Sequence, residues 1–428
     1  MGLALSLPDS PERFAGLEMP RSCTLPSGSR VVWLPMAEAP LVCIDLWCQA
    51  GSAFERTSES GMAHFLEHMV FKGSDQLQAG EFDLRIEALG GSSNAATGFD
   101  DVHYHVLVPP DALAEAVTLL LDLVLQPRLD PADFDMERQV VLEELAQSHD
   151  QPDELALQTL LELGCGAHPY GRAILGVEAA LNNHSAAAMR QFQQGLYSGE
   201  RCVLAICGPL EETHWQALLA QLALSPLGQL PRLQQVAEPP LLQIQPGVHR
   251  QTFGQLESAR LLMAWSLPGA ADRDDLAAMD LATSLLAEGR RSRLVERLRE
   301  QLQLVESIDL DLQVLEFGSL ALLEAVCDAE DLSAVRQEIT TVLLQSQQEM
   351  PEGAELQRGL ALVRNGYRFS LEAAAGIAAV IGNNGLWGRP LDLAEPLNSI
   401  NRIDETALHT SLSLLDPGRA CVLEAVPA

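Results

Sequence analysis

The sequence predicts an α+β protein whose first half contains a mostly antiparallel sheet. Short stretches rich in valine, isoleucine and tryptophan come in pairs, and longer stretches rich in leucine, alanine and glutamate lie between and after them. This order favours an antiparallel sheet covered by helices, because a doubly wound parallel sheet requires strands and helices to alternate. The glycine patterns typical of nucleotide-binding parallel sheets, G-x-G-x-x-G and G-x-x-x-x-G-K, do not occur in the sequence.

An internal repeat is the second observation. The segment DLWCQAG, which contains Trp47, matches MAWSLPG, which contains Trp265, at an offset of 218 positions. The segment GERCVLA, which contains Cys202, resembles GRACVLE, which contains Cys421, at an offset of 219. Two matches at nearly the same offset predict a duplicated domain.

The stretch between the repeats has the composition of a linker. Residues 224–240 contain four prolines and show no hydrophobic periodicity. Such a segment favours neither helix nor strand. The sequence therefore predicts a first domain at residues 1–223 and a second at residues 241–428.

The strands and helices expected in the first half follow from the residue types of each stretch and from the positions of proline and glycine. Strands rich in β-branched and aromatic residues are expected at 30–34, 42–49 and 101–108. Helices are expected at 61–71, 81–89, 110–125 and 131–147. The last two begin at proline, which suits the first helical turn, and the second stops at Gly90 and Gly91.

The composition indicates a globular chain with a strongly acidic balance. Of its 428 residues, 59 are Asp or Glu and 27 are Lys or Arg, which gives a net charge of −32. Nucleic acid is excluded as a partner, because binding it requires a basic surface. The charge either keeps the protein soluble or draws cationic ligands into an acidic cavity, and composition alone does not separate the two.

The cellular compartment is suggested by what the sequence lacks. No apolar run is long enough to span a bilayer, and the N-terminal residues lack the basic and apolar segments of a secretory signal. The eight cysteines are scattered and form no C-x-x-C pair, which is typical of free thiols in a reducing compartment. We therefore expect a cytoplasmic protein without a membrane span.

His64, Glu67 and His68 form the pattern His-x-x-Glu-His inside a predicted helix. Residues three and four apart share a helix face, so both imidazoles can reach one tetrahedral Zn²⁺. The adjacent carboxylate can take a proton from water, as in the inverted form of the H-E-x-x-H motif. The alternative is a helix whose histidines only pack and form hydrogen bonds.

A third ligand is expected on the helix predicted at 131–147. Glu137 and Glu144 are two turns apart and share a face with Val140 and Val141, so we expect both carboxylates to turn toward the core. Glu143 is rotated by about 100° and should be more exposed. Buried carboxylates are costly without a partner, and a metal ion is a suitable partner.

Two further histidines, His103 and His105, alternate along a predicted strand and share one of its faces. They could be taken for a second metal site. No third ligand is evident beside them in the sequence, so we interpret them as structural.

The segment GMAHFLEHMVFKGS and the later glutamate helix resemble the pitrilysin/insulinase-type zinc peptidases, the inverzincins, in their short two-domain form. Glu144 lies 76 positions after His68, as the glutamate ligand of that family does. The segments GGSSNAATGFDDVHYHVLVP and HPYGRAILG extend the resemblance over most of the first half. The resemblance implies two homologous domains, each a mostly antiparallel sheet flanked by helices, which together form half of a clamshell peptidase.

The resemblance also implies roles for single residues. His64, His68 and Glu144 would hold one Zn²⁺ per chain, Glu67 would act as general base, and Glu137 matches the accessory catalytic glutamate of the family. Substrates in the family are peptides that add as a strand beside a segment corresponding here to Asn94, Ala95, Ala96 and Thr97. The second half carries apolar residues where the repeat places the metal motif, so we expect no metal there; these residues are Ala282, Leu285, Leu286 and Leu362.

The chain departs from the family in its second half. Family members supply an arginine and a tyrosine, seven residues apart, to the substrate; Arg299 fits the arginine, but Glu306 occupies the tyrosine position. A carboxylate there has no hydrogen to donate to a developing oxyanion. Either this alignment is shifted or the chain lacks that function.

Assembly is the last expectation from the resemblance. Members that act alone have twice as many such domains, so we expect a zinc endopeptidase subunit for unfolded peptides, including basic ones, that pairs with a related chain carrying the Arg/Tyr pair. A self-sufficient homodimer and a non-catalytic structural subunit of the same fold remain the alternatives.

Overall fold

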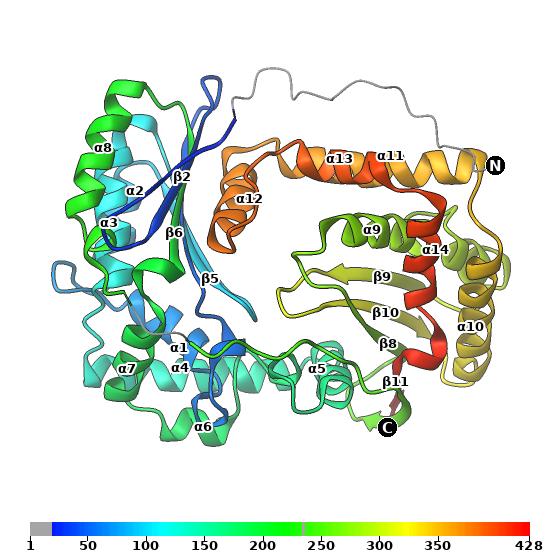
Figure 1. Ribbon diagram of the computed structural model, residues 1–428. Coiled ribbons are helices and arrows are strands. Elements are labelled where there is room, and N and C mark those ends of the chain that lie inside the picture. Colours follow the sequence, from blue (N-terminus) through cyan, green and yellow to red (C-terminus); the bar gives the residue numbers. More distant parts are fainter. Residues whose placement is uncertain (1–18, 233–235) are drawn as a thin grey trace.

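The computed structural model describes residues 19–232 and 236–428, and Figure 1 shows one sheet in each half of the molecule. The first sheet has six strands in the order β1-β2-β6-β3-β5-β4. They are β1 (Arg21–Thr24), β2 (Arg30–Pro35), β3 (Val42–Cys48), β4 (Ser92–Thr97), β5 (Val102–Val108) and β6 (Cys202–Gly208). The three predicted strands are confirmed as β2, β3 and β5. The sequence of β4, SSNAAT, has no apolar alternation, and only the resemblance indicated a strand there.

The second sheet repeats the topology of the first. Its order is β7-β11-β8-β10-β9. The strands are β7 (Gly247–Phe253), β8 (Ala259–Leu267), β9 (Ser307–Gln313), β10 (Ser319–Cys327) and β11 (Cys421–Pro427). In both sheets one parallel pair, β2 with β6 or β7 with β11, is followed by three antiparallel pairings. The α+β class and the relatedness of the two halves are therefore confirmed.

The four helices predicted in the first half are confirmed at closely matching ranges as α1 to α4, and the structure adds helices that the sequence analysis did not predict. Together they are α1 (Met62–Val70), α2 (Glu81–Ala88), α3 (Leu113–Leu125), α4 (Pro131–His149), α5 (Pro152–Cys165), α6 (Glu178–Asn183), α7 (Ala186–Leu196) and α8 (Glu212–Leu224). The helix predicted at 110–125 begins with a 3-10 turn at Pro110–Ala112. In Figure 1, α2, α3 and α8 lie on the outer side of the first sheet.

The second half contains a similar set of helices. They are α9 (Arg273–Ala287), α10 (Leu332–Gln348), α11 (Gly353–Ser370), α12 (Ala374–Leu386), α13 (Glu395–Arg402) and α14 (Glu405–Leu414). A π-helical stretch, Val295–Gln301, follows α9.

The two halves exchange one helix each. Helix α12 belongs to the second half but packs on β2, β3 and β6 of the first sheet, where Ile377 and Ile381 join a buried cluster with Trp47. Helix α5 belongs to the first half but packs on β8 and β11, where Leu160 joins a cluster with Leu423. Each half therefore completes the core of the other (Figure 1).

The stretch predicted as a linker contains no α-helix or strand among its described residues after Leu224. A 3-10 turn, Leu227–Gln229, follows α8 and buries Leu227 against the first core, and residues 233–235 lie outside the described part. The predicted domain limits at 223 and 241 stay predictions. The N-terminal residues that bear on a secretory signal, 1–18, also lie outside the described part. None of the described helices is long and apolar enough to cross a membrane.

Candidate metal centre

Helix α1, which carries the His-x-x-Glu-His pattern, begins at a tightly fixed point. Gly61 has a φ of +83°, a left-handed conformation that favours glycine. The buried Glu55 accepts hydrogen bonds from the backbone N–H groups of Gly61 (3.0 Å) and Ala63 (2.8 Å), which have no partner within the helix. The first turn of α1 is therefore held in place just before His64.

The structure brings His64, His68 and Glu144 together. Each offers one donor atom, and these atoms lie within 4.8 Å of one another. The Nε2 atom of His64 is 3.7 Å from Oε1 of Glu144, and Nε2 of His68 is 3.4 Å from Oε2 of Glu144. Ligands about 2.1 Å from a tetrahedral zinc ion lie roughly 3.4 Å apart. Two imidazoles and a carboxylate at these separations fit one divalent ion of the zinc type.

The two imidazoles differ in their electrostatic surroundings. Burial, together with the neighbouring His68, lowers the pKa of His64 to about 4, so this ring is neutral and has a free lone pair at physiological pH. Burial also acts to lower the pKa of His68. The hydrogen bond to Glu137 and the charges of Glu144 and Glu137 outweigh that effect, and the pKa of His68 is raised.

Glu137 holds His68 from behind. Its Oε1 atom is 3.0 Å from Nδ1 of His68, and its Oε2 atom is 2.5 Å from Nζ of Lys72. Burial acts to raise the pKa of Glu137, but these two partners outweigh it and the pKa is lowered. Glu137 therefore lies beside the donor group as a charged residue that orients one imidazole.

One detail of the sequence prediction for α4 is wrong. Glu137, Val141 and Glu144 face α1 as expected, and Glu143 is exposed. Val140, however, is 46% exposed and does not belong to the buried face. Val140 lies at the side of this buried face. On an α-helix, the residues four and seven positions after Glu137 point more nearly in the direction of Glu137 than Val140, which is three positions after it.

Glu67 lies beside the donor group without belonging to it. Its carboxylate accepts a hydrogen bond from the hydroxyl of Thr97 on β4. Burial raises the pKa of Glu67, although the Thr97 hydrogen bond and the nearby His68 act to lower it. A carboxylate with a raised pKa, fixed next to a metal-ligand group, is suited to accept and return a proton.

The predicted substrate segment forms the edge strand β4. Its residues Asn94, Ala95, Ala96 and Thr97 pair with β5, and the order of the sheet leaves the other side of β4 without a partner strand among the described residues. Asn94 and Ala96 are exposed. This edge is available for pairing with another strand.

Arg299 is not brought to the donor group by any contact among the described residues. It lies on the π-helical stretch Val295–Gln301, and its guanidinium donates to the carboxylate of Glu300 at 2.9 and 3.1 Å. Glu306 lies just before β9 and accepts a hydrogen bond from the hydroxyl of Ser258 at 3.3 Å. Its role as a substitute for the family tyrosine stays a prediction.

Sequence reasoning missed two residues that the structure places beside candidate metal-ligand side chains. Lys72 pairs with Glu137, and its place one turn after His68 was the available signal. Asp45 lies beside His103 and His105, so the statement that no third ligand accompanies these histidines is wrong. The signal for Asp45 was a single charged residue inside the otherwise apolar strand VCIDLWC.

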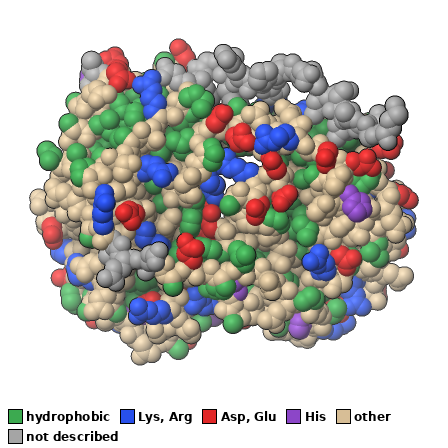
Figure 2. All heavy atoms as spheres, in the orientation of Figure 1, with side chains coloured by type: hydrophobic (Ala, Val, Ile, Leu, Met, Phe, Trp, Pro, Cys, Tyr) green, Lys and Arg blue, Asp and Glu red, His purple; other side chains and the backbone are tan. Residues whose placement is uncertain are grey.

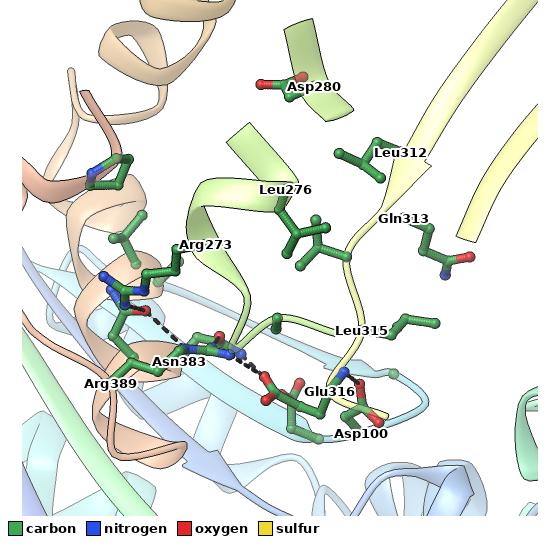
Figure 3. A pocket seen from close by; sticks show the side chains of 18 of the residues that line it. Asp100, Arg273, Leu276, Asp280, Leu312, Gln313, Leu315, Glu316, Asn383 and Arg389 are labelled. Carbon is green, nitrogen blue, oxygen red and sulfur yellow. Dashed lines mark hydrogen bonds and ion pairs between the residues drawn. The ribbon is translucent and has the colours of Figure 1, made fainter. Parts of the chain in front are cut away.

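A cavity of about 780 Å³ lies between the halves, separate from the donor group (Figure 3). Asp100, Arg273, Asp280, Glu316 and Arg389 contribute its charged side chains together with Asp101. None of the donors on α1 and α4 lines it. On the face shown in Figure 2, an opening between the halves is bordered by both acidic and basic side chains.

The fold and the donor group define a two-domain α+β protein with an inverted His-x-x-Glu-His motif in one domain only. Residues 30–178 match the family model described as Insulinase (Peptidase family M16), and residues 183–362 match the model described as Peptidase M16 inactive domain. The chain belongs to the M16 peptidase family of pitrilysin/insulinase type.

Individual proteins with similar sequences extend this comparison. An uncharacterized zinc protease of Mycobacterium leprae is 28% identical over 394 residues, which cover 89% of this chain and 85% of the relative. An uncharacterized zinc protease of Rickettsia bellii is 24% identical over 89% of this chain and 92% of its own. A probable mitochondrial-processing peptidase subunit beta of Arabidopsis thaliana is 31% identical over 45% of this chain and 36% of its own.

Solved structures share the fold at low sequence identity. A protease from Helicobacter pylori superposes with a TM-score of 0.87 at 22% identity, covering 96% of this chain and 100% of that one. A Pseudomonas fluorescens structure described as a peptidase M16 inactive domain gives 0.85 at 18% identity, covering 96% of this chain and 98% of that one. These similarities confirm the two-domain fold.

Proposed function

We propose that this chain is a zinc-dependent endopeptidase that cleaves unfolded peptides. The observation that carries the proposal is the donor group of His64, His68 and Glu144, with the carboxylate of Glu67 beside it. The zinc-protease names of the Mycobacterium and Rickettsia relatives support both the metal and the reaction. The proposed stoichiometry is one zinc ion per chain at this group.

Each side chain of the site has a defined task in this proposal. When bound, zinc supplies Lewis acidity that activates water and polarises the peptide carbonyl. Glu67, fixed by Thr97, takes a proton from the attacking water and passes it to the leaving amine. Glu137 keeps the His68 ring oriented through Nδ1, so that Nε2 faces Glu144.

The substrate is proposed to bind along the edge strand β4. A peptide that pairs with Asn94–Thr97 makes main-chain hydrogen bonds, which give affinity with loose demands on sequence. The net charge of −32 favours basic peptides. Cleavage of a basic peptide should slow as added salt screens this attraction, whereas cleavage of an acidic peptide of equal length should not. Equal turnover of both peptides at every salt concentration contradicts the charge preference.

The active form is proposed to be a heterodimer with a related two-domain chain. Arg299 has no contact with the donor group within the described chain, and Glu306 has no hydrogen to donate where the family has tyrosine. The Arabidopsis relative is by name one subunit of a peptidase. Light scattering and activity should show that a related Tyr-bearing chain associates with this one and raises its turnover. Full activity from this chain alone, as monomer or homodimer, contradicts the proposal.

The decisive test separates the base from the metal ligands. Glu67→Gln should keep zinc, because this residue is not among the donors, and should lose about 10²–10⁴-fold in peptide cleavage. Glu143→Gln, an exposed neighbour of the ligand Glu144, is the matched control and should keep both zinc and activity. Elemental analysis and a fluorogenic peptide assay measure the two quantities. A Glu67→Gln protein that cleaves at the wild-type rate rules the mechanism out.

A further inference from the structure

A second group of metal-ligand side chains lies on the first sheet. Asp45 on β3 and His103 and His105 on β5 each offer one donor atom, and these atoms lie within 4.8 Å of one another. The two strands pair so that Asp45 stands opposite His105. We propose that these three side chains bind a divalent first-row transition-metal ion, separately from the proposed zinc site.

The first support is the burial of a carboxylate that lacks a strong cationic partner. Asp45 is only 2% exposed and lies in the otherwise apolar strand β3. A buried charge is costly unless it is paired or coordinates a metal. Within the described chain, no lysine or arginine forms an ion pair with Asp45, and its partner is His103, with Nδ1 3.0 Å from Oδ1.

The second support is the fixed arrangement of the donors. The His103 ring stacks on Trp47 with a centroid separation of 4.2 Å and an interplanar angle of 16°. The His105 ring lies 5.7 Å from it at 21°, as expected for side chains on one face of a strand. The 3.0 Å between Nδ1 of His103 and Oδ1 of Asp45 matches neighbouring ligands about 2.1 Å from an octahedral ion, which lie roughly 3.0 Å apart.

The donor types decide the class of metal. Imidazole suits zinc, iron, nickel and copper, whereas magnesium and calcium prefer ligands that are all oxygen. Two imidazoles and one carboxylate leave coordination positions open for water or a small ligand. The side chain of His103 is 22% exposed, so an ion can reach the group from solvent.

The location gives the ion a structural consequence. Asn94 stands opposite His105 on β4, so the group lies one strand in from the edge proposed to receive peptides. An ion bound by side chains of both β3 and β5 would link these two strands. Because the edge strand β4 pairs with β5, this link would also stabilise the position of β4. Without a metal, the contact that the structure gives Asp45 in this group is the one between its Oδ1 atom and Nδ1 of His103.

The experiment isolates this group from the proposed zinc site. The background is the full chain, free of any histidine tag and stripped with a chelator, that carries His64→Gln and His68→Gln. Cobalt and zinc are titrated into it by calorimetry, with magnesium as the negative probe. The test variants add His105→Gln or Asp45→Asn, and the matched control adds His214→Gln, an exposed histidine outside both groups.

One equivalent of cobalt or zinc should bind to the background and to the His214→Gln control, and magnesium should not bind. His105→Gln should weaken the affinity at least about 100-fold, because a ligand is removed rather than merely reoriented. Circular dichroism checks the fold, and if the buried Asp45→Asn variant is unfolded, the partly exposed His105→Gln decides. No binding to the background, or the same affinity after His105→Gln, overturns the proposal. Either outcome leaves the zinc peptidase proposal intact, since that site is absent from the background.

Discussion

At the scale of the residue, the donor group depends on a chain of contacts that begins behind it. Lys72 neutralises Glu137, and Glu137 holds Nδ1 of His68. This arrangement leaves Nε2 of His68 directed at Glu144. Partners of this kind commonly alter metal affinity without touching the metal.

Glu137→Gln should therefore weaken zinc binding by about 10–100-fold. The amide still accepts a hydrogen bond from His68, but it has no charge to pair with Lys72 and stabilises the ring less. Competition with a chromophoric chelator measures the affinity. Glu143→Gln, on the exposed side of the same helix, is the control and should bind zinc as the wild type does. Equal affinities in the two variants would mean that Glu137 does not support His68.

The residues of the donor group could be anticipated where helix periodicity decides their position. His64 and His68 lie one turn apart, and the direction of Glu144 follows from its place on α4. Lys72 and Asp45 could not be assigned partners in this way. Their contacts are set by the packing of α1 on α4 and by the register of β3 against β5, neither of which the sequence states.

At the scale of the element, the least predictable feature is the exchange of α5 and α12. Apolar periodicity identifies the face that each helix buries, but it does not say which sheet will cover that face. Each helix lies within one half of the sequence, and each packs on the sheet of the other half. The strand order was not predicted, because β4 and the parallel partners β2 and β6 carry no pairing signal of their own in the sequence.

The close fit of α12 on the first sheet leads to a stability prediction. A Cβ atom at Gly382 would lie 2.5 Å from Nε1 of Trp47 and 3.1 Å from Cβ of Ala205. Gly382→Ala should therefore lower the free energy of unfolding by about 1–3 kcal/mol, the usual cost of overpacking. Gly366→Ala on α11, where a Cβ meets nothing within 4 Å, should instead stabilise by about 0.5–1 kcal/mol. Thermal and urea unfolding measure both, and equal effects would contradict the packing of α12.

At the scale of the whole molecule, a buried polar network joins the two halves. Tyr170 donates to Asp100 at 2.5 Å and accepts from the backbone N–H of Phe317 at 3.0 Å. Asp100 also accepts from the backbone N–H of Glu316 at 2.8 Å, and the Glu316 side chain pairs with Arg389 (Figure 3). Residues from both halves are thus joined by hydrogen bonds beside the central cavity. The position of one half relative to the other therefore depends on the charge of the groups in this network.

Glu316 should make the stability of the protein fall as the pH rises. Burial raises the pKa of Glu316 from 4.5 to about 7; Arg389 opposes this shift, and Asp100 and Asp101 add to it. The folded state therefore holds the proton more tightly than the unfolded chain does. The stability that Glu316 contributes by binding its proton more tightly in the folded state is complete below pH 4.5 and is lost as the pH rises through about 7.

The overall charge of −32 also favours lower pH, so the wild-type slope alone does not identify Glu316 as its source. Glu316→Gln, which cannot ionise, should flatten the decline of the melting temperature between pH 5 and 8, even if the loss of a charge partner for Arg389 lowers the whole curve. The exposed Glu349→Gln removes the same charge outside the network and should keep the wild-type slope. Calorimetry across this pH range measures the slopes. If the three slopes are equal, Glu316 does not titrate in this range, and the pH dependence comes from other groups.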